Sequence, residues 1–201
     1  SKIIAKGIKH ISFYSLTLEE GTPMFSLGKN KKLIMPKEDT EREMYYAGRN
    51  IMEKNNLMQY EISNFAVKGY ECRHNLKYWN QEEYIGIGPS AHSFLGIMRY
   101  KNPNDLTEYI LRDEDGIFER NIQEVMDNNE LMFEYVMLRL RLNEGLYFAD
   151  FKNKFSADFK EKYKEQIEYL ANNNLIECNS ERVYLTKKGI DISNYVFEQF
   201  C

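Results

Sequence analysis

Residues 60–79, with the sequence YEISNFAVKGYECRHNLKYW, gather several side chains that are capable of binding a ligand. His74 is one of three histidines in the chain, and Trp79 is its single tryptophan. If this segment is helical, His74 and Tyr78 lie four residues apart on one face. An imidazole beside two large aromatic rings suits a flat, iron-bearing ligand such as haem, and Asn75 would orient that ligand or cap the backbone. The alternative is a structural histidine, with Trp79 filling part of a core.

Residues 86–93, GIGPSAHS, form a second candidate site. Gly86 and Gly88 permit the backbone to approach a ligand closely, and Gly-rich turns after strands often cradle a phosphate or the polar end of a nucleotide-like cofactor. The dinucleotide fingerprint G-x-G-x-x-G is not met, because Ala91 stands at its third glycine position. The alternative is tight packing of a strand end against a helix.

A third group consists of polar residues at predicted strand ends. Glu61, Ser63 and Asn64, with Glu19 and Glu20, are candidates for lining the mouth of an α/β barrel, where active sites of such folds collect. The alternative for the two early glutamates is a solvated helix start. No Ser-His-Asp or Cys-His arrangement stands out.

Composition limits the class of protein. The 201 residues are 43% hydrophobic and 14% aromatic, which is enough for one large or two small packed domains. A net charge of −4 argues against a nucleic-acid binder held by phosphate contacts, and no apolar run is long enough to span a membrane. Cys72, Cys178 and Cys201 are widely spaced, which is typical of reduced thiols in a cytoplasmic protein.

The first half of the chain alternates strand and helix patterns. Residues 9–18 are rich in strand formers, residues 35–56 show a helical pattern, and residues 57–66 and 83–95 again resemble strands. On the predicted helix, the apolar residues near one face are Met44, Ala47, Ile51 and Met52. Strand, helix and strand in this order predict an α/β fold.

The second half is mainly helical. Residues 121–145 predict a long helix whose buried face consists of Phe133, Val136, Met137 and Leu140. Two further helical segments, a hairpin within residues 175–185 and a final helix suggest a winged-helix-like module. We expect domains at 1–115 and 116–201. Residues 146–201 contain eight Lys/Arg and nine Asp/Glu, a balance that argues against DNA binding and favours a protein-facing or lid role.

Several of these segments together resemble a known family. HISFYSLTLEEGTPM, YEISNFAVKGYECRHNLKYW and YIGIGPSAHSF resemble successive blocks of the oxygen-independent coproporphyrinogen III oxidase superfamily of radical S-adenosylmethionine proteins. LRLRLNEGLYFADF and the residues after it resemble the C-terminal domain of that superfamily. The resemblance runs in order along nearly the whole chain. It implies the C-terminal part of a radical-SAM partial (β/α) barrel, followed by a mainly helical, winged-helix-like domain.

Within that superfamily, HNLKYW is similar to the H-N-x-x-Y-W pattern of the haem-chaperone branch. This implies a protein of haem metabolism that binds haem and delivers it to client proteins, membrane-associated ones among them. His74 would be the iron ligand, Asn75 stands at a motif position, and Tyr78 and Trp79 would pack on the porphyrin. The alternative within the superfamily is oxidative decarboxylation of coproporphyrinogen III to protoporphyrinogen IX, a step of porphyrin biosynthesis.

The resemblance also implies S-adenosylmethionine and a [4Fe–4S] cluster held by a C-x-x-x-C-x-x-C motif. The sequence contains no such motif, so we expect the chain to be a fragment without the cluster-binding half, inactive as an enzyme by itself. Thr17, Gly86, Gly88 and His92 are the expected contacts to S-adenosylmethionine. Because half a barrel leaves strand edges unpaired, we also expect either a homodimer or non-native packing of residues 1–100.

Overall fold

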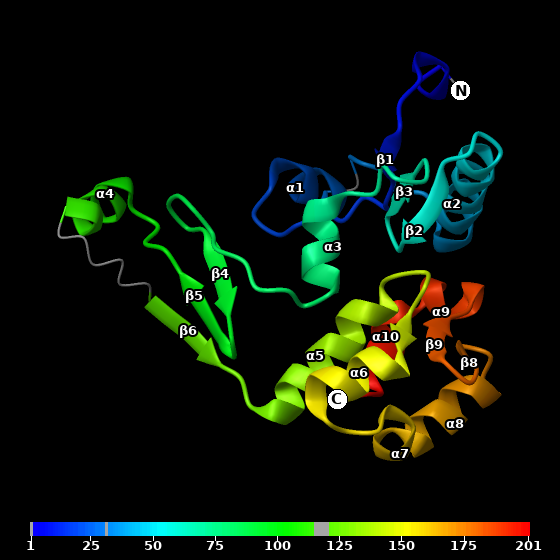
Figure 1. Cartoon of the computed structure of the whole chain (residues 1–201). Helices are drawn as coiled ribbons and strands as arrows, with labels where there is room; N and C mark the ends of the chain where they lie inside the picture. Colours follow the sequence, from blue (N-terminus) through cyan, green and yellow to red (C-terminus); the bar gives the residue numbers. More distant parts are fainter. Residues whose placement is uncertain (1, 31, 115–120) are drawn as a thin grey trace. The chain divides into compact units, whose positions relative to one another are not determined.

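The computed structural model describes residues 2–30, 32–114 and 121–201, which fall into two compact units. The first unit ends at Cys72 and the second begins at Arg73 (Figure 1). The predicted domain boundary near residue 115 lies outside the described residues. The mixture of helices and strands confirms the predicted α/β class.

The first unit is a small sheet with a long helix beside it. Its elements are the 3-10 helix η1 (Ile4–Lys6), β1 (His10–Ser12), α1 (Pro23–Lys29), α2 (Glu38–Glu53), β2 (Met58–Glu61) and β3 (Asn64–Ala66). The sheet order is β1-β3-β2, and both outer strands pair antiparallel with β3. The two outer strands therefore point the same way, as in the expected strand-helix-strand unit, with β3 inserted between them. Met52, Leu57 and Phe65 form its buried core.

Two predictions for this unit need correction. Only His10–Ser12 of residues 9–18 is a strand, and Tyr14 and Leu16 beyond it are exposed. Residues 57–66 form a hairpin rather than one strand, with a turn at Ile62 whose carbonyl accepts hydrogen bonds from the side chains of Tyr45 and Gln59.

The predicted helix is confirmed as α2, but with a different buried face. Met44 and Ile51 are exposed, whereas Met52 is buried. The side of α2 that carries Tyr45, Arg49 and Met52 is the less exposed one. Three acids occupy its first turn, where the helix dipole favours negative charge.

The second unit begins with a helix and a three-stranded sheet. The elements are α3 (Arg73–Trp79), β4 (His92–Leu95), β5 (Met98–Lys101), α4 (Leu106–Glu114) and β6 (Asn121–Val125). The sheet is antiparallel in the order β4-β5-β6, with Leu95 opposite Met98 and Met98 opposite Val125. Of the strand predicted over 83–95, only the last four residues form β4, and Tyr84 folds back to bridge Phe94. Residues 121–125, predicted as helix, form β6.

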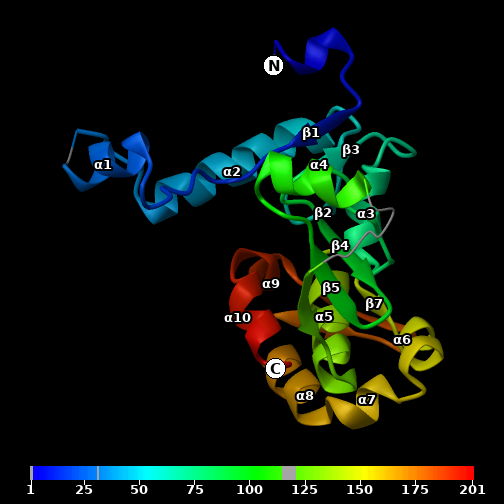
Figure 2. The same ribbon diagram turned by 90° about the vertical axis from the view of Figure 1, so that its left-hand side faces the viewer.

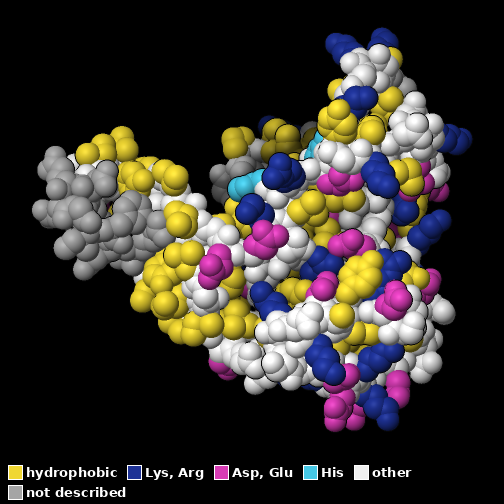
Figure 3. Space-filling model, viewed as in Figure 1, with side chains coloured by type: hydrophobic (Ala, Val, Ile, Leu, Met, Phe, Trp, Pro, Cys, Tyr) yellow, Lys and Arg dark blue, Asp and Glu magenta, His cyan; other side chains and the backbone are white. Residues whose placement is uncertain are grey.

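This sheet leaves large apolar side chains in solvent. Figure 3 shows hydrophobic side chains gathered over β5 and β6. Among the exposed ones are Ile97, Ile122 and Val125. The expected homodimer remains a prediction.

The rest of the second unit packs helices around a small sheet (Figures 1 and 2). The elements are α5 (Asn128–Leu140), β7 (Leu146–Tyr147), α6 (Phe148–Phe155), α7 (Phe159–Lys162), α8 (Lys164–Asn172), β8 (Ile176–Cys178), β9 (Arg182–Leu185), α9 (Lys187–Asp191) and α10 (Ser193–Glu198). The sheet order is β7-β9-β8, so the predicted hairpin is confirmed within a winged-helix-like arrangement. None of the helices described is both long and apolar enough to cross a lipid bilayer.

Helix α5 begins later than predicted and buries a wider face. Asp127 and Glu130 form a capping box, which starts the helix at Asn128. Val136 and Leu140 are buried as predicted, and Phe133 and Met137 are only partly buried. The other buried positions on this helix are Met132, Tyr135 and Arg139.

Candidate functional site

Helix α3 carries the four residues of the predicted ligand site. His74 and Tyr78 lie one turn apart, and their rings meet edge to face with centroids 4.9 Å apart at 88°. After Trp79 the chain turns at Gln81, whose φ of +51° is in the left-handed region. The backbone N–H of Gln81 donates to the carbonyl of Tyr78 and closes the end of the helix.

An aromatic row continues from Tyr78 away from His74. The Tyr78 ring meets the Tyr84 ring edge to face at 4.7 Å, and Tyr84 lies 6.5 Å from Phe94. Such edge-to-face pairs are a favoured arrangement of aromatic rings. His74 is exposed and Tyr78 is partly buried. The imidazole therefore stands at the open end of a row of packed rings.

The surroundings of His74 are compatible with binding the iron of haem. Neither ring nitrogen of His74 makes a hydrogen bond to any residue that the structure describes, so either is available to a metal. Across residues 2–30, 32–114 and 121–201, no three His, Cys, Asp or Glu side chains form a group that would hold a metal ion. Haem does not need such a group, because the porphyrin supplies four nitrogens and the protein supplies only axial ligands.

Trp79 and Asn75 differ from His74 in being partly buried. The Trp79 ring lies under the guanidinium of Arg141, at 4.7 Å from the ring centroid. This cation–π contact joins α3 to the end of α5. Trp79 thus anchors α3 to the end of α5. This agrees in part with the alternative drawn from the sequence, in which Trp79 has a structural role.

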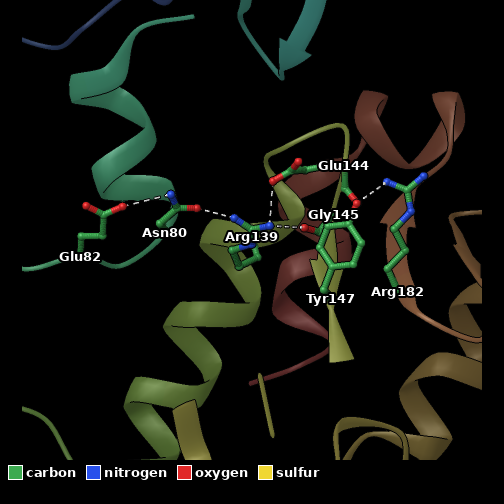
Figure 4. Close-up of polar contacts among 7 residues, drawn as sticks. All are labelled: Asn80, Glu82, Arg139, Glu144, Gly145, Tyr147 and Arg182. Carbon is green, nitrogen blue, oxygen red and sulfur yellow. Dashed lines mark hydrogen bonds and ion pairs between the residues drawn. The ribbon is translucent and has the colours of Figure 1, made fainter. Parts of the chain in front are cut away.

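A buried arginine strengthens the same connection. Arg139 is 5% exposed and donates from Nη1 to the Oδ1 of Asn80, directly after α3. Its Nη2 donates to the Glu144 carboxylate at 2.9 Å and to the Gly145 carbonyl at 3.0 Å. Figure 4 shows the guanidinium between these groups, with Glu82 on the far side of Asn80. We call Asn80, Arg139, Glu144 and Gly145 the arginine clamp.

Gln81 makes a further connection to α5. Its Nε2 donates to the Leu131 carbonyl at 3.1 Å and to the Glu134 carboxylate at 2.9 Å. No sequence pattern singled out Gln81 or Arg139, although both are buried polar residues next to the HNLKYW motif in space.

The glycine-rich turn is held by side chains of its own unit. The N–H of Gly86 donates to Ser93, and the N–H of Gly88 donates to the Tyr109 hydroxyl, both at 3.0 Å. The buried Asn102 donates to the carbonyls of both glycines. Gly86 also has no room for a side chain, because a Cβ would lie 2.1 Å from the His92 carbonyl oxygen. The N–H groups of Gly86 and Gly88 are therefore already hydrogen-bonded within the unit, which favours tight packing of this turn over binding of a ligand by these two groups.

The predicted contacts to S-adenosylmethionine remain predictions. His92 is exposed on β4, opposite Lys101, and Thr17 is exposed in the first unit. The structure brings His92 close to Gly86.

The polar residues at the first sheet are mostly engaged. Glu61 is 1% exposed and accepts a hydrogen bond from the N–H of Ser63. Asn64 accepts from the Ser12 hydroxyl at 2.6 Å. Glu19 and Glu20 are exposed. Glu61 and Asn64 therefore stabilise the β1-β3-β2 sheet and its turn.

Comparisons with known proteins give consistent results. Residues 126–192 match the family described as the HemN C-terminal domain. The chain is 36% identical over 200 residues to a protein named heme chaperone HemW from Lactococcus lactis subsp. lactis (strain IL1403), covering 99% of this chain and 52% of that protein. It is 35% identical over 193 residues to heme chaperone HemW of Bacillus subtilis (strain 168), covering 96% and 51%.

A solved structure shares the fold. It is titled "Coproporphyrinogen III oxidase (HemN) from Escherichia coli is a Radical SAM enzyme" and matches with a TM-score of 0.70 at 15% identity. The match covers 99% of this chain and 49% of that one. The chain thus spans about half the length of the relatives it matches.

Proposed function

We propose that this chain, which is similar over nearly its whole length to proteins named heme chaperone HemW, binds haem on α3 and passes it to haem-dependent client proteins. The observation that carries the proposal is the exposed imidazole of His74, packed edge-on against Tyr78 at the end of an aromatic row. Relatives that are 36% and 35% identical over nearly the whole chain bear the name heme chaperone.

His74 would hold the cargo through a neutral imidazole nitrogen bound to the iron. Tyr78 would limit the rotation of the imidazole and offer a ring edge to the porphyrin. Trp79 would act from the buried side, since its contact with Arg141 fixes the helix on which His74 stands.

The exposure of His74 suits a protein that releases its cargo. A site with one open histidine leaves the opposite face of the iron accessible to a ligand from a client. Clients, including membrane-associated ones, and a cytoplasmic location belong to this proposal as well. Binding of S-adenosylmethionine and of a [4Fe–4S] cluster is also part of this proposal, although the sequence has no C-x-x-x-C-x-x-C motif to hold the cluster.

The oxidase alternative has less support. The likeness to the HemN structure is at 15% identity, a level that concerns the fold rather than the reaction. Conversion of coproporphyrinogen III under anaerobic conditions by a reconstituted full-length protein that contains this chain would favour that alternative over a chaperone.

A haem titration followed by absorbance tests the proposal. We expect haem to bind with a shift of its Soret band, and His74→Ala to weaken the affinity by about tenfold or more, because the iron loses its protein ligand. His92→Ala is the matched control, since His92 is also exposed but lies on β4. An unchanged spectrum and affinity for His74→Ala would remove His74 from the site.

A further inference from the structure

A pocket of about 300 Å³ lies beside α3 and is lined by residues of α3, β4, β5 and α5. The rings of Tyr78, Tyr84 and Phe94 belong to its wall, and those of Tyr78 and Tyr84 are only partly buried. Tyr78 also meets the imidazole of His74, which does not line the pocket. A flat ligand that is bound at His74 and is wider than one side chain can therefore extend past Tyr78 to the pocket.

The size of the pocket suits one edge of such a ligand. Its volume is at the lower end of the range for small-molecule sites, so a macrocycle would enter only in part and leave its opposite edge in solvent. The aromatic wall favours packing against another planar ring.

Arg99 is the one cation among the described residues that line the pocket, and it is already engaged. It donates to the Glu134 carboxylate and contacts the Glu124 carboxylate at 3.4 Å. Its guanidinium also lies 5.3 Å from the centroid of the Phe94 ring. An anionic group that entered the pocket would have to compete with these carboxylates for Arg99.

The other charges near the pocket do not favour an anion either. Glu82 lines the pocket, whereas its ion-pair partner Lys77 does not. Lys154, which lies near Glu134, is also outside the lining. A carboxylate in the pocket would therefore meet two carboxylates of the protein, and like charges placed side by side are repulsive.

We propose that this pocket receives the apolar edge of a porphyrin and excludes its propionates, so that the chain selects porphyrins with carboxylates on one edge only. Protoporphyrin IX, the macrocycle of haem, has propionates on one edge and methyl and vinyl groups on the other. Coproporphyrin III carries a propionate on every pyrrole and has no edge free of charge. The inference rests on the proposed haem site at His74 and adds a basis for selectivity between porphyrins.

Iron-free porphyrins test the pocket separately from the bond between His74 and iron. Protoporphyrin IX and coproporphyrin III are titrated into the protein, and binding is followed by quenching of the emission of Trp79, the single tryptophan, which lines the pocket. We expect protoporphyrin IX to bind at least about tenfold more tightly than coproporphyrin III. Equal affinities, or no saturable binding of protoporphyrin IX, would overturn the proposal. Neither result decides the titration of haem with His74→Ala, which concerns the iron bond alone.

A first variant tests the aromatic wall. Tyr84→Ala removes one ring of the wall, and we expect it to weaken the binding of iron-free protoporphyrin IX at least about fivefold. Tyr195→Ala is the matched control, since Tyr195 is an exposed tyrosine on α10 and does not line the pocket. Unchanged binding of protoporphyrin IX in Tyr84→Ala would contradict the placement of the porphyrin in this pocket.

A second variant tests the charge, and it keeps the proposal testable if Tyr84→Ala does not fold. Glu134→Gln keeps the shape of the side chain and an acceptor for Arg99 but removes the negative charge. We expect the preference for protoporphyrin IX over coproporphyrin III to narrow at least about threefold. Glu161→Gln is the matched control, because Glu161 lies on α7 outside the pocket. The same preference in Glu134→Gln as in the unaltered protein would show that the carboxylates do not exclude propionates.

Discussion

The two ends of α3 are held in different ways. At the C-terminal end, Trp79, Asn80 and Gln81 each contact residues of α5 or the residues directly after it. At the N-terminal end, Arg73 and His74 are exposed. Attachment to α5 and the proposed contact with haem therefore fall on different residues of α3 and of the turn after it. Substitutions at the anchored end should change stability first, and substitutions at the open end should change ligand binding alone.

The largest effect should come from breaking the turn that closes the arginine clamp. Gly145 has a φ of +74°, and a Cβ there would lie 2.0 Å from the Val183 carbonyl oxygen. Gly145→Ala should lower the free energy of unfolding by about 3 kcal/mol or more, measured by urea denaturation.

Gly96→Ala is the control for Gly145→Ala. Gly96 has a φ of +60°, but a Cβ at this position would meet no other atom within 4 Å, so only the backbone penalty of about 1 kcal/mol is expected. Equal losses for the two variants would mean that the turn around Gly145 relaxes and that the clamp is not tightly held.

A smaller effect should follow from removing the guanidinium of the clamp. Arg139→Met leaves Asn80 Oδ1 and the Gly145 carbonyl without their donor, and we expect a loss of about 2 kcal/mol in the free energy of unfolding. The double variant with Asn80→Ala should reveal a coupling of about 1 kcal/mol between the two residues.

The carboxylate of the clamp provides the contrast. The Glu144 side chain is 52% exposed, so Glu144→Gln should lower the free energy of unfolding by less than about 0.5 kcal/mol.

The double variant of Arg139→Met and Asn80→Ala has an outcome that would contradict the predicted coupling. If the two losses in the free energy of unfolding simply add, the contact between α3 and α5 does not depend on this pair.

Local patterns predicted the parts of the molecule that short-range spacing determines. The four-residue separation of His74 and Tyr78 predicted their ring contact, and the polar turn between residues 178 and 182 predicted the β8-β9 hairpin. The late start of α5 was also readable, since Asp127 and Glu130 have the spacing of a capping box. The prediction of helix over residues 121–125 was wrong, because the capping box starts the helix at Asn128 and the residues before it pair with β5 as β6.

Other parts depend on contacts between distant residues. The turn at Ile62 has no glycine or proline, and it is fixed by Tyr45, 17 residues earlier. Arg139 has a side chain that is usually exposed, and its burial depends on Asn80, 59 residues earlier. No periodicity in the sequence reports such pairs, so Arg139 and Gln81 were missed.

A pH titration should have no effect near neutral pH, and at alkaline pH it should act on the helical part of the second unit rather than on the open end of α3. Tyr163 is 5% exposed among the rings of Phe151, Phe159 and Phe200, and burial raises its pKa to about 12. Between pH 10 and 12 the unfolded chain releases this proton while the folded protein keeps it. The stability that is fully present below pH 10 is therefore lost as the pH rises through that window, by at most about 3 kcal/mol.

Tyr163→Phe removes the titrating group and keeps the ring, so its free energy of unfolding should fall less steeply between pH 10 and 12. Part of the slope should remain, because burial also raises the pKa of Tyr135. Tyr70→Phe, at an exposed position of the first unit, should leave the slope unchanged. Haem affinity near neutral pH should be the same in all three proteins, since the aromatic core supports α3 from the anchored side only. A change in haem affinity for Tyr163→Phe would mean that the core and the open end of α3 are coupled.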